Sequence, residues 1–325
     1  MHSISVVIPV YNAEKTLDEL YDQLVVVLES LDSQFEIIMV EDHGQDESWE
    51  IIQSITVRDS RVRGIRLSRN FGQHNALLCG IRVARNDVII TMDDDLQNPV
   101  VEIPNLLSKL EQGYDVVYGT PDKVQQGWVR KIATQITKLV LQNAIGVESA
   151  QRVSGFRAFR AKFCVAFKDY QSPFVSIDVL LTWGTANFGF ITVEHVPRRY
   201  GYSNYTVMQL IKHTMNLLTG FSTLPLQLAS FVGFFFALFG IAVLGWVLSR
   251  YVLYGSAVTG FPFLASIIAI FSGAQLFALG IFGEYLARMH FRTLGRPAYV
   301  VAESSPVVED EVSEYKSTKI IKDQD

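Results

Sequence analysis

The stretch VIITMDDDLQNP, residues 88–99, decides the fold class of this chain. It opens with an apolar, β-branched run that predicts a short buried strand, and three consecutive aspartates follow where that strand ends. In open α/β sheets, ligands bind beyond the carboxyl ends of the parallel strands. The aspartates therefore stand at a ligand-binding position if the flanking sequence forms such a sheet.

The flanking sequence repeats the same pattern on both sides. Short runs rich in Val and Ile are typical of buried parallel strands; they are residues 4–9, 35–40, 62–67 and 116–118. The segments between the strands have helical spacing; they are residues 13–31, 48–57, 75–84 and 101–112. A further strand is expected at residues 190–196. Strand and helix in alternation predict an α/β fold with a doubly wound sheet and crossover helices.

An apolar block follows this α/β region. Residues 213–283 carry one Asp, Glu, Lys or Arg, namely Arg250. Within the block, residues 226–248 and 263–283 are each long enough to cross a hydrocarbon core of about 30 Å. We expect a transmembrane hairpin, with a buried hairpin of a soluble core as the alternative. Basic residues flank both outer ends of the block, so the positive-inside rule places both termini in the cytoplasm.

The segment just before the block predicts an amphipathic helix. Val207, Ile211, Met215, Leu218 and Phe221 fall on one helical face, as in a helix lying in a membrane interface. An ordinary core-packing helix is the alternative. The expected organisation is a soluble domain over residues 1–205, the interface helix over 206–222, two spans within 223–286 (about 224–248 and 262–284), and a C-terminal segment over 287–325.

Charge and motifs exclude several classes of protein. The net charge is −5, and the acidic tail from Ala302 onward supplies −4 of it, so no basic footprint for nucleic acid is present. The tail has a disordered composition. Cys79 and Cys164 are isolated and form neither a disulfide framework nor a zinc motif. No glycine pair has the G-x-G spacing and no Gly-Lys pair occurs, which excludes the dinucleotide fingerprint and the P-loop.

The three aspartates suggest a divalent cation. Three adjacent carboxylates repel one another, whereas Mg²⁺ or Mn²⁺ takes a few hard oxygen ligands and can bridge to the phosphates of a substrate. In an extended chain Asp93 and Asp95 face the same way. A solvated acidic turn is the alternative reading of these residues.

Six segments of the chain resemble one known family in their sequence and order. They are VVIPVYN (6–12), VEDHGQDES (40–48), LSRNFGQHNALLCGI (67–81), DDDLQNP (93–99), SGFRAF (154–159) and VPRRYGYSNYTV (196–207). Together they are similar to the family 2 glycosyltransferases of GT-A fold that act on polyprenyl phosphates. Within that family the chain resembles bacterial bactoprenol glucosyltransferases and undecaprenyl-phosphate 4-deoxy-4-formamido-L-arabinose transferases, and more distantly dolichol-phosphate mannose synthases.

The resemblance implies a Rossmann-like nucleotide-sugar domain and a defined reaction. We expect inverting, Mg²⁺- or Mn²⁺-dependent transfer of a sugar from a nucleotide sugar, with UDP-glucose favoured, to undecaprenyl phosphate. The expected location is the cytoplasmic membrane of a bacterium, with membrane lipids around the spans. Whether the chain forms a homo-oligomer is left open.

The resemblance also assigns roles at the donor end. Pro9, Tyr11 and Glu14 match the segment lining the base and ribose, and Asp42 matches the carboxylate that hydrogen-bonds the base. The chain departs from the family at Glu41, where Asp is common, and at residues 43–45, where Gly-Ser is usual.

The metal-binding pattern D-x-D-x-Q of the family falls on the aspartate run. It matches Asp93, Asp95 and Gln97, with Asp95 also counted as catalytic, and leaves Asp94 near the nucleoside or the donor sugar.

At the acceptor end the family uses cations to hold the lipid phosphate beside the diphosphate. Arg130, Arg152, Ser154 and Arg157 match the segment of the acceptor-phosphate site. Arg198 and Ser203 match the loop that contacts the diphosphate. Arginine offers a fork suited to phosphate oxygens, although each of these could be an ordinary surface arginine. The usual Asp-Pro-Thr before Ser-Gly is replaced by Gln-Arg-Val, which weakens the assignment of Arg152.

The expected mechanism needs no strong general base. A phosphate monoester has a second pKa of about 6, so the acceptor already carries a nucleophilic oxygen at neutral pH. Asp178 is the one base candidate, and a carboxylate at a helix start after Ser176 is the alternative explanation of it.

Two other functions compete with this one. Processive polysaccharide synthases share the nucleotide domain, but their Q-x-x-R-W motif is absent because no tryptophan of this chain follows an arginine. A non-catalytic membrane-anchored scaffold would be expected to lose metal ligands, whereas Asp93, Asp95 and Gln97 are all present.

Overall fold

The computed structural model describes residues 3–121, 153–194, 223–254 and 261–306. The chain divides into two compact units. One comprises Met1–Val207 together with Arg296–Asp325, and the other comprises Met208–Gly295. The expected interface helix at 206–222 lies outside the described residues.

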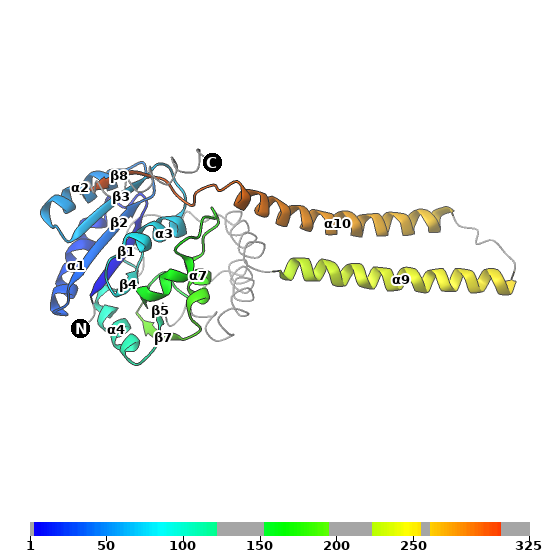
Figure 1. Ribbon diagram of the computed structural model, residues 1–325, viewed down its shortest axis with the longest axis horizontal. Helices are drawn as coiled ribbons and strands as arrows, with labels where there is room; N and C mark the ends of the chain where they lie inside the picture. Colours follow the sequence, from blue (N-terminus) through cyan, green and yellow to red (C-terminus); the bar gives the residue numbers. More distant parts are fainter. Residues whose placement is uncertain (1–2, 122–152, 195–222, 255–260, 307–325) are drawn as a thin grey trace, which may run out of the picture. The chain divides into compact units, whose positions relative to one another are not determined.

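A single mixed sheet organises the first unit (Figure 1). Within the described residues it has eight strands in the order β7-β5-β6-β4-β1-β2-β3-β8. Their bounds are β1 Ile4–Val10, β2 Phe35–Glu41, β3 Val62–Leu67, β4 Val88–Thr91, β5 Val116–Pro121, β6 Arg157–Arg160, β7 Phe188–Val193 and β8 Val301–Ser305. The α/β fold and all the strands expected from the sequence are confirmed.

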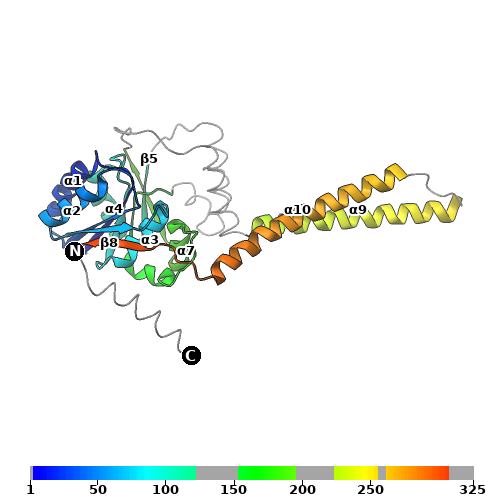
Figure 2. The ribbon, with the colours of Figure 1, turned by 90° about the horizontal axis from the view of Figure 1, so that it is seen from above.

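Two antiparallel strands make the sheet mixed rather than wholly parallel. Strand β6 runs antiparallel to both β4 and β5. Strand β8, labelled in Figure 2, runs antiparallel to β3 at the sheet edge. Residues 301–305 belong to β8, so this part of the C-terminal segment is ordered as a strand although its composition suggests a solvated end. Its backbone completes the edge that β3 would otherwise expose.

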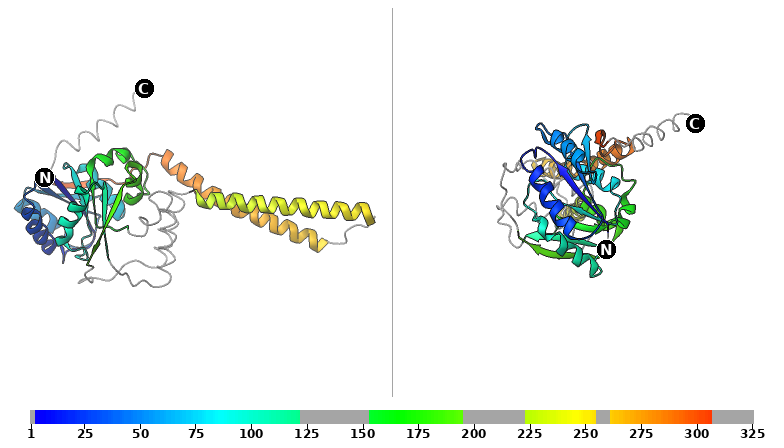
Figure 3. Two further views of the ribbon diagram at one scale, coloured as in Figure 1. Left: turned by 90° about the horizontal axis from the view of Figure 1, so that it is seen from below. Right: turned by 90° about the vertical axis from the view of Figure 1, so that its left-hand side faces the viewer.

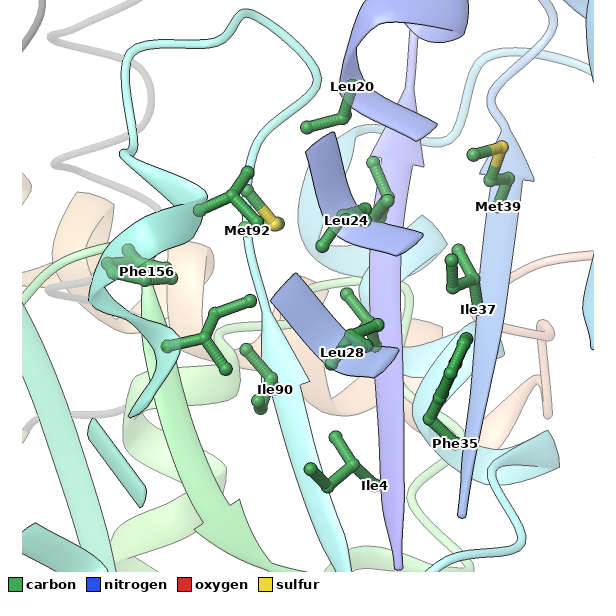
Figure 4. Packing of buried hydrophobic residues seen from close by; sticks show 14 of the residues in the cluster. Ile4, Leu20, Leu24, Leu28, Phe35, Ile37, Met39, Ile90, Met92 and Phe156 are labelled. Atoms are coloured by element: carbon green, nitrogen blue, oxygen red, sulfur yellow. The ribbon is translucent and has the colours of Figure 1, made fainter. Parts of the chain in front are cut away.

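Helices cover both faces of the sheet. Their bounds are α1 Leu17–Ser30, α2 Ser48–Arg58, α3 Gln73–Val83, α4 Ile103–Glu111 and α7 Ile177–Gly184, with 3-10 turns η1 Val100–Glu102 and η2 Ala161–Phe167. Helix α1 buries Leu17, Leu20, Leu24 and Leu28, whose spacing forms one apolar stripe. This stripe packs on alternate residues of β1, β2 and β4 in a core that also receives α2 and α4 (Figure 4).

The opposite face of the sheet is covered by α3. A Cβ added to Gly80 of α3 would stand 2.4 Å from Val7 and 3.1 Å from Val40, so this glycine lets the helix approach the sheet closely. Helices α3 and α7 contact each other on this side. Loops at the carboxyl ends of β1, β2 and β4 are thus held between two packed layers.

The second unit contains two long apolar helices that run antiparallel to each other (Figure 1, Figure 3). They are α9 Leu224–Tyr254 and α10 Phe261–Thr293. The segments Pro225–Arg250 and Ile270–Phe291 have mean hydropathies of 2.4 and 1.3 and are long and apolar enough to cross a membrane. The helices touch where the ring of Phe271 packs against Phe236, with ring centroids 5.6 Å apart, and beside Gly240, where a Cβ would stand 3.2 Å from that ring.

Candidate active site

The aspartate run lies in the loop after β4, beside the loop that follows β1. Strands β1 and β4 are neighbours, so their carboxyl ends bring the two loops together. The backbone N–H of Tyr11 donates a 2.9 Å hydrogen bond to Oδ2 of Asp94. The structure therefore joins Tyr11, which the family resemblance places at the base and ribose, to Asp94, which it places near the nucleoside or the donor sugar.

The two predicted metal ligands that flank Asp94 are held from different sides. The side-chain amide of Gln73, at the start of α3, donates to Oδ1 of Asp93 at 2.6 Å. The backbone N–H of Gln97 donates to Oδ1 of Asp95 at 3.1 Å. All three aspartates are half-buried as residues, and the carboxyl of Asp94 is the one turned into the protein.

The charge balance of this loop favours a cation. Burial, reinforced by the negative charges of Asp93 and Asp95, raises the pKa of the Asp94 carboxyl from 3.8 to about 7. Crowded carboxylates of this kind are stabilised when a positive ion binds nearby.

The residues present fit a divalent cation that shares its ligands with a substrate. Among the described residues, no three His, Cys, Asp or Glu side chains converge into a ready-made cage. Mg²⁺ typically needs only one or two carboxylates, because waters and substrate phosphates supply the other oxygens. Asp93 and Asp95 match that limited donor set.

A glycine makes room for the first of these carboxylates. A Cβ added to Gly155 would stand 3.0 Å from both Oδ1 and Oδ2 of Asp93. The carbonyl oxygen of Gly155 accepts a 2.8 Å hydrogen bond from the hydroxyl of Thr91. This bond fixes the turn at residues 154–156, the SGF turn, against the end of β4. Sequence reasoning missed the role of Gly155, because it depends on β6 pairing beside β4.

The loops after β1 and β2 are tied together. Pro9 is buried within β1, and Tyr11 is 43% exposed at its end. The N–H of Glu14 donates to Asp46 at 2.9 Å, and the carboxylate of Glu14 accepts from the N–H of Glu47 at 3.4 Å. These contacts hold Glu14 beside the start of α2.

Asp42 turns its carboxylate toward the backbone at the start of α3. Its two oxygens accept hydrogen bonds from the N–H groups of Phe71 and Gly72, both at 2.7 Å. Burial raises the pKa of the Asp42 carboxyl from 3.8 to about 6, against the lowering effect of these two donors. In this structure, Asp42 positions the β3–α3 loop.

Two residues with separately predicted roles are partners. The Arg157 guanidinium forms an ion pair with the carboxylate of Asp178 and also donates to the hydroxyl of Thr91 at 2.9 Å. Oδ1 of Asp178 accepts a further 3.1 Å hydrogen bond from the Tyr118 hydroxyl. Arg157 is 1% exposed, so it lies beneath the site.

The remaining predicted residues divide into two groups. The hydroxyl oxygen of Ser154 accepts a 3.2 Å hydrogen bond from the N–H of Phe156 in the turn that leads into β6. Arg130, Arg152, Arg198 and Ser203 lie outside the described residues.

Comparison with known proteins agrees with this geometry. The model of the family "Glycosyl transferase family 2" matches residues 5–167. An undecaprenyl-phosphate 4-deoxy-4-formamido-L-arabinose transferase of Pseudomonas syringae is 34% identical over 95% of this chain and 94% of its own length. A protein of the same name from Shewanella sediminis is 36% identical over 92% of each chain.

A solved structure shares the fold. Glucosyl-3-phosphoglycerate synthase of Mycobacterium tuberculosis, in complex with Mn²⁺, UDP-glucose and glycerol 3-phosphate, superposes with a TM-score of 0.50 and 17% identity. The match covers 67% of this chain and 78% of that one. The GT-A-like architecture expected from the six segments is confirmed, as is their family resemblance.

Proposed function

This chain belongs to glycosyltransferase family 2, and on that premise we propose that it transfers a sugar from a nucleotide sugar to undecaprenyl phosphate. One observation carries the proposal: relatives named undecaprenyl-phosphate transferases match more than nine-tenths of this chain, the two long apolar helices included. With a lipid acceptor, the two helices would anchor the enzyme in the membrane, where the acceptor phosphate lies.

The donor sugar is the finer part of the proposal. The sequence alone favours UDP-glucose, whereas the names of the relatives support 4-deoxy-4-formamido-L-arabinose. We propose the formamido-arabinose donor, linked to UDP, with glucose as the alternative. A screen of UDP- and GDP-sugars with undecaprenyl phosphate in detergent separates them, and a GDP-sugar as the preferred donor would overturn the nucleotide assignment.

A divalent cation, Mg²⁺ or Mn²⁺, fits the donor end. Asp93 and Asp95 would hold it together with Gln97, and Tyr11, Glu14 and Asp94 would line the nucleoside. When bound, the cation would stabilise the negative charge that develops on the departing nucleoside diphosphate. Gln73 and Gly155 would fix the orientation of Asp93.

The acceptor end is proposed to use Arg130, Arg152 and Ser154 for the lipid phosphate, and Arg198 and Ser203 are proposed to contact the diphosphate of the donor. An oxygen of the acceptor phosphate attacks the anomeric carbon, the bond from that carbon to the diphosphate breaks, and the configuration inverts. The phosphate is largely dianionic at neutral pH, so no proton must be removed first. Because Asp178 is paired with buried Arg157, we propose that this pair positions the SGF turn rather than acting as a base.

The distribution of basic residues predicts how the protein is oriented in the membrane. Basic residues outside both spans favour placing the catalytic unit and the C-terminus in the cytoplasm. A cysteine introduced at position 255 should then react with an impermeant reagent on intact cells, and one at position 310 should not. The reverse labelling would put the site away from the nucleotide-sugar pool.

A further inference from the structure

Three charged residues form one row across strands β2, β3 and β8. The register places Glu41 opposite Arg66 in the parallel pair and Arg66 opposite Glu303 in the antiparallel pair. Residues that stand opposite each other on neighbouring strands project from the same face. The row faces α2, whose Trp49 lies against it. It connects the C-terminal strand to the strand that leads into the β2–α2 loop, residues 42–47.

Continuous contacts run along this row. Oε2 of Glu303 accepts a 3.0 Å hydrogen bond from the indole N–H of Trp49, and the Arg66 guanidinium lies 5.9 Å from the centroid of that indole. Nε of Arg66 is 3.1 Å from Oε2 of Glu41, a carboxylate with 2% side-chain exposure. The other oxygen of Glu41 accepts the backbone N–H of Gly44. The contacts thus reach from the C-terminal strand into the β2–α2 loop.

The β2–α2 loop needs such an anchor because its backbone is constrained. His43 has φ of 56° and Asn12, in the facing β1 loop, has φ of 54°, both in the left-handed region that disfavours ordinary side chains. Oδ1 of Asn12 accepts the N–H of Gln45 at 2.8 Å and would stand 2.7 Å from a Cβ added to Gly44. The Glu41 carboxylate therefore holds Gly44 in a narrow space beside the β1 loop.

We propose that Glu303 is a positioning residue for the donor nucleotide, acting through Trp49, Arg66 and Glu41 on the β2–α2 loop. The inference rests on the proposed function, since this loop adjoins Asn12, the neighbour of Tyr11 in the proposed nucleotide site. Without the Glu303 acceptor the indole loses its hydrogen bond and ceases to fix Arg66. The buried Glu41 carboxylate then loses its cation, and an unpaired buried charge is costly, so the loop relaxes.

The same strand offers a matched control. The hydroxyl of Ser305 is 2.7 Å from that of Thr56 and anchors β8 to α2 two register pairs further along. No contact in the row described above passes through Ser305. Ser305→Ala therefore weakens the attachment of β8 without touching Arg66, whereas Glu303→Ala weakens both.

Hydrogen exchange tests the coupling without any substrate. In full-length protein in detergent, Glu303→Ala should raise the exchange rate of the amides at 43–46 by about fivefold, because the acceptor of the Gly44 N–H becomes mobile. Ser305→Ala and Glu303→Gln, which retains a hydrogen-bond acceptor for Trp49, should leave that rate unchanged. Unchanged exchange in Glu303→Ala, or equal acceleration by Ser305→Ala, would overturn the inference whatever the protein binds.

Nucleotide affinity tests the functional consequence. With UDP and MnCl₂ as the probe, and GDP as the comparison, Glu303→Ala should weaken the Kd for UDP about fivefold with little change in kcat at saturating donor. Ser305→Ala should bind as wild type does. If wild type binds neither nucleotide, the proposed function fails together with this inference; if wild type binds and the two variants behave alike, the inference alone fails.

Discussion

The side-chain amide of Gln73 holds Oδ1 of Asp93 at 2.6 Å, joining the first turn of α3 to the aspartate run. This hydrogen bond fixes the orientation of the Asp93 carboxylate. Removing a residue that hydrogen-bonds a metal-binding side chain typically lowers metal affinity by about 10- to 100-fold.

We therefore expect Gln73→Ala to weaken Mn²⁺ binding by about tenfold, because Asp93 loses its fixed orientation. Titration of the purified full-length protein with Mn²⁺, followed by electron paramagnetic resonance, measures this directly. Gln53→Ala, which alters an exposed glutamine of α2, is the matched control. Equal Mn²⁺ affinity in Gln73→Ala and wild type would separate Gln73 from the cation site.

Gly155→Ala should lower the rate of transfer by about tenfold while the protein stays folded. Its Cβ would press on both carboxylate oxygens of Asp93 at 3.0 Å, a distance that forces the carboxylate to move. Gly245→Ala provides the control, since a Cβ at that position meets no atom within 4 Å. Transfer rates and thermal unfolding of both variants should be compared, and transfer by Gly155→Ala at the wild-type rate would contradict the packing of this turn against the aspartate.

The buried Arg157–Asp178 pair predicts a pattern in a double-mutant cycle. Removing one partner leaves an uncompensated buried charge, at a cost of about 3–5 kcal/mol, whereas removing both does not. Arg157→Met should therefore lower Tm more than the double variant Arg157→Met with Asp178→Leu. Thermal unfolding of the four proteins gives the coupling, and strictly additive losses of Tm would mean that the two side chains do not pair in solution.

Asp42 predicts a pH dependence of stability. Its folded-state pKa of about 6 lies above the ordinary 3.8, so the folded protein retains a proton that the unfolded chain releases between these values. The Asp42 contribution to the free energy of unfolding is therefore full below pH 3.8 and declines as the pH rises toward 6. The Tm of wild type minus the Tm of Asp42→Asn should therefore fall as the pH rises from 3.8 to about 6. A difference that is constant with pH would show that the Asp42 pKa is not raised.

The strands of the central sheet were predictable because their sequences are mostly apolar along both faces. Residues 4–10 and 35–41 are buried throughout, which is the pattern of a parallel strand covered on each side. Strand β8 was not predictable, since VAESS is polar and lies at an edge, where pairing with β3 rather than burial stabilises it.

The site residues at the ends of parallel strands were predictable from the sequence. The contacts that depend on antiparallel pairing of β6 were not. The approach of Asp94 to Tyr11 follows from the adjacency of β1 and β4. The burial of Arg157 has no signature in sequence, because an arginine looks the same in sequence whether its side chain meets solvent or a buried carboxylate. The contact of Gly155 with Asp93 likewise requires knowing that β6 pairs with β4.

The most direct test of the account is sugar transfer to undecaprenyl phosphate by the purified full-length protein, followed by mass spectrometry of the lipid. UDP-4-deoxy-4-formamido-L-arabinose and UDP-glucose are offered separately, with Mn²⁺ or with a chelator, to wild type and to Asp95→Asn. We expect glycosylated undecaprenyl phosphate from wild type with one of these donors and the cation, and none with the chelator or from Asp95→Asn. The absence of lipid product with both donors, or undiminished product from Asp95→Asn, would contradict the proposed metal-dependent transfer to undecaprenyl phosphate.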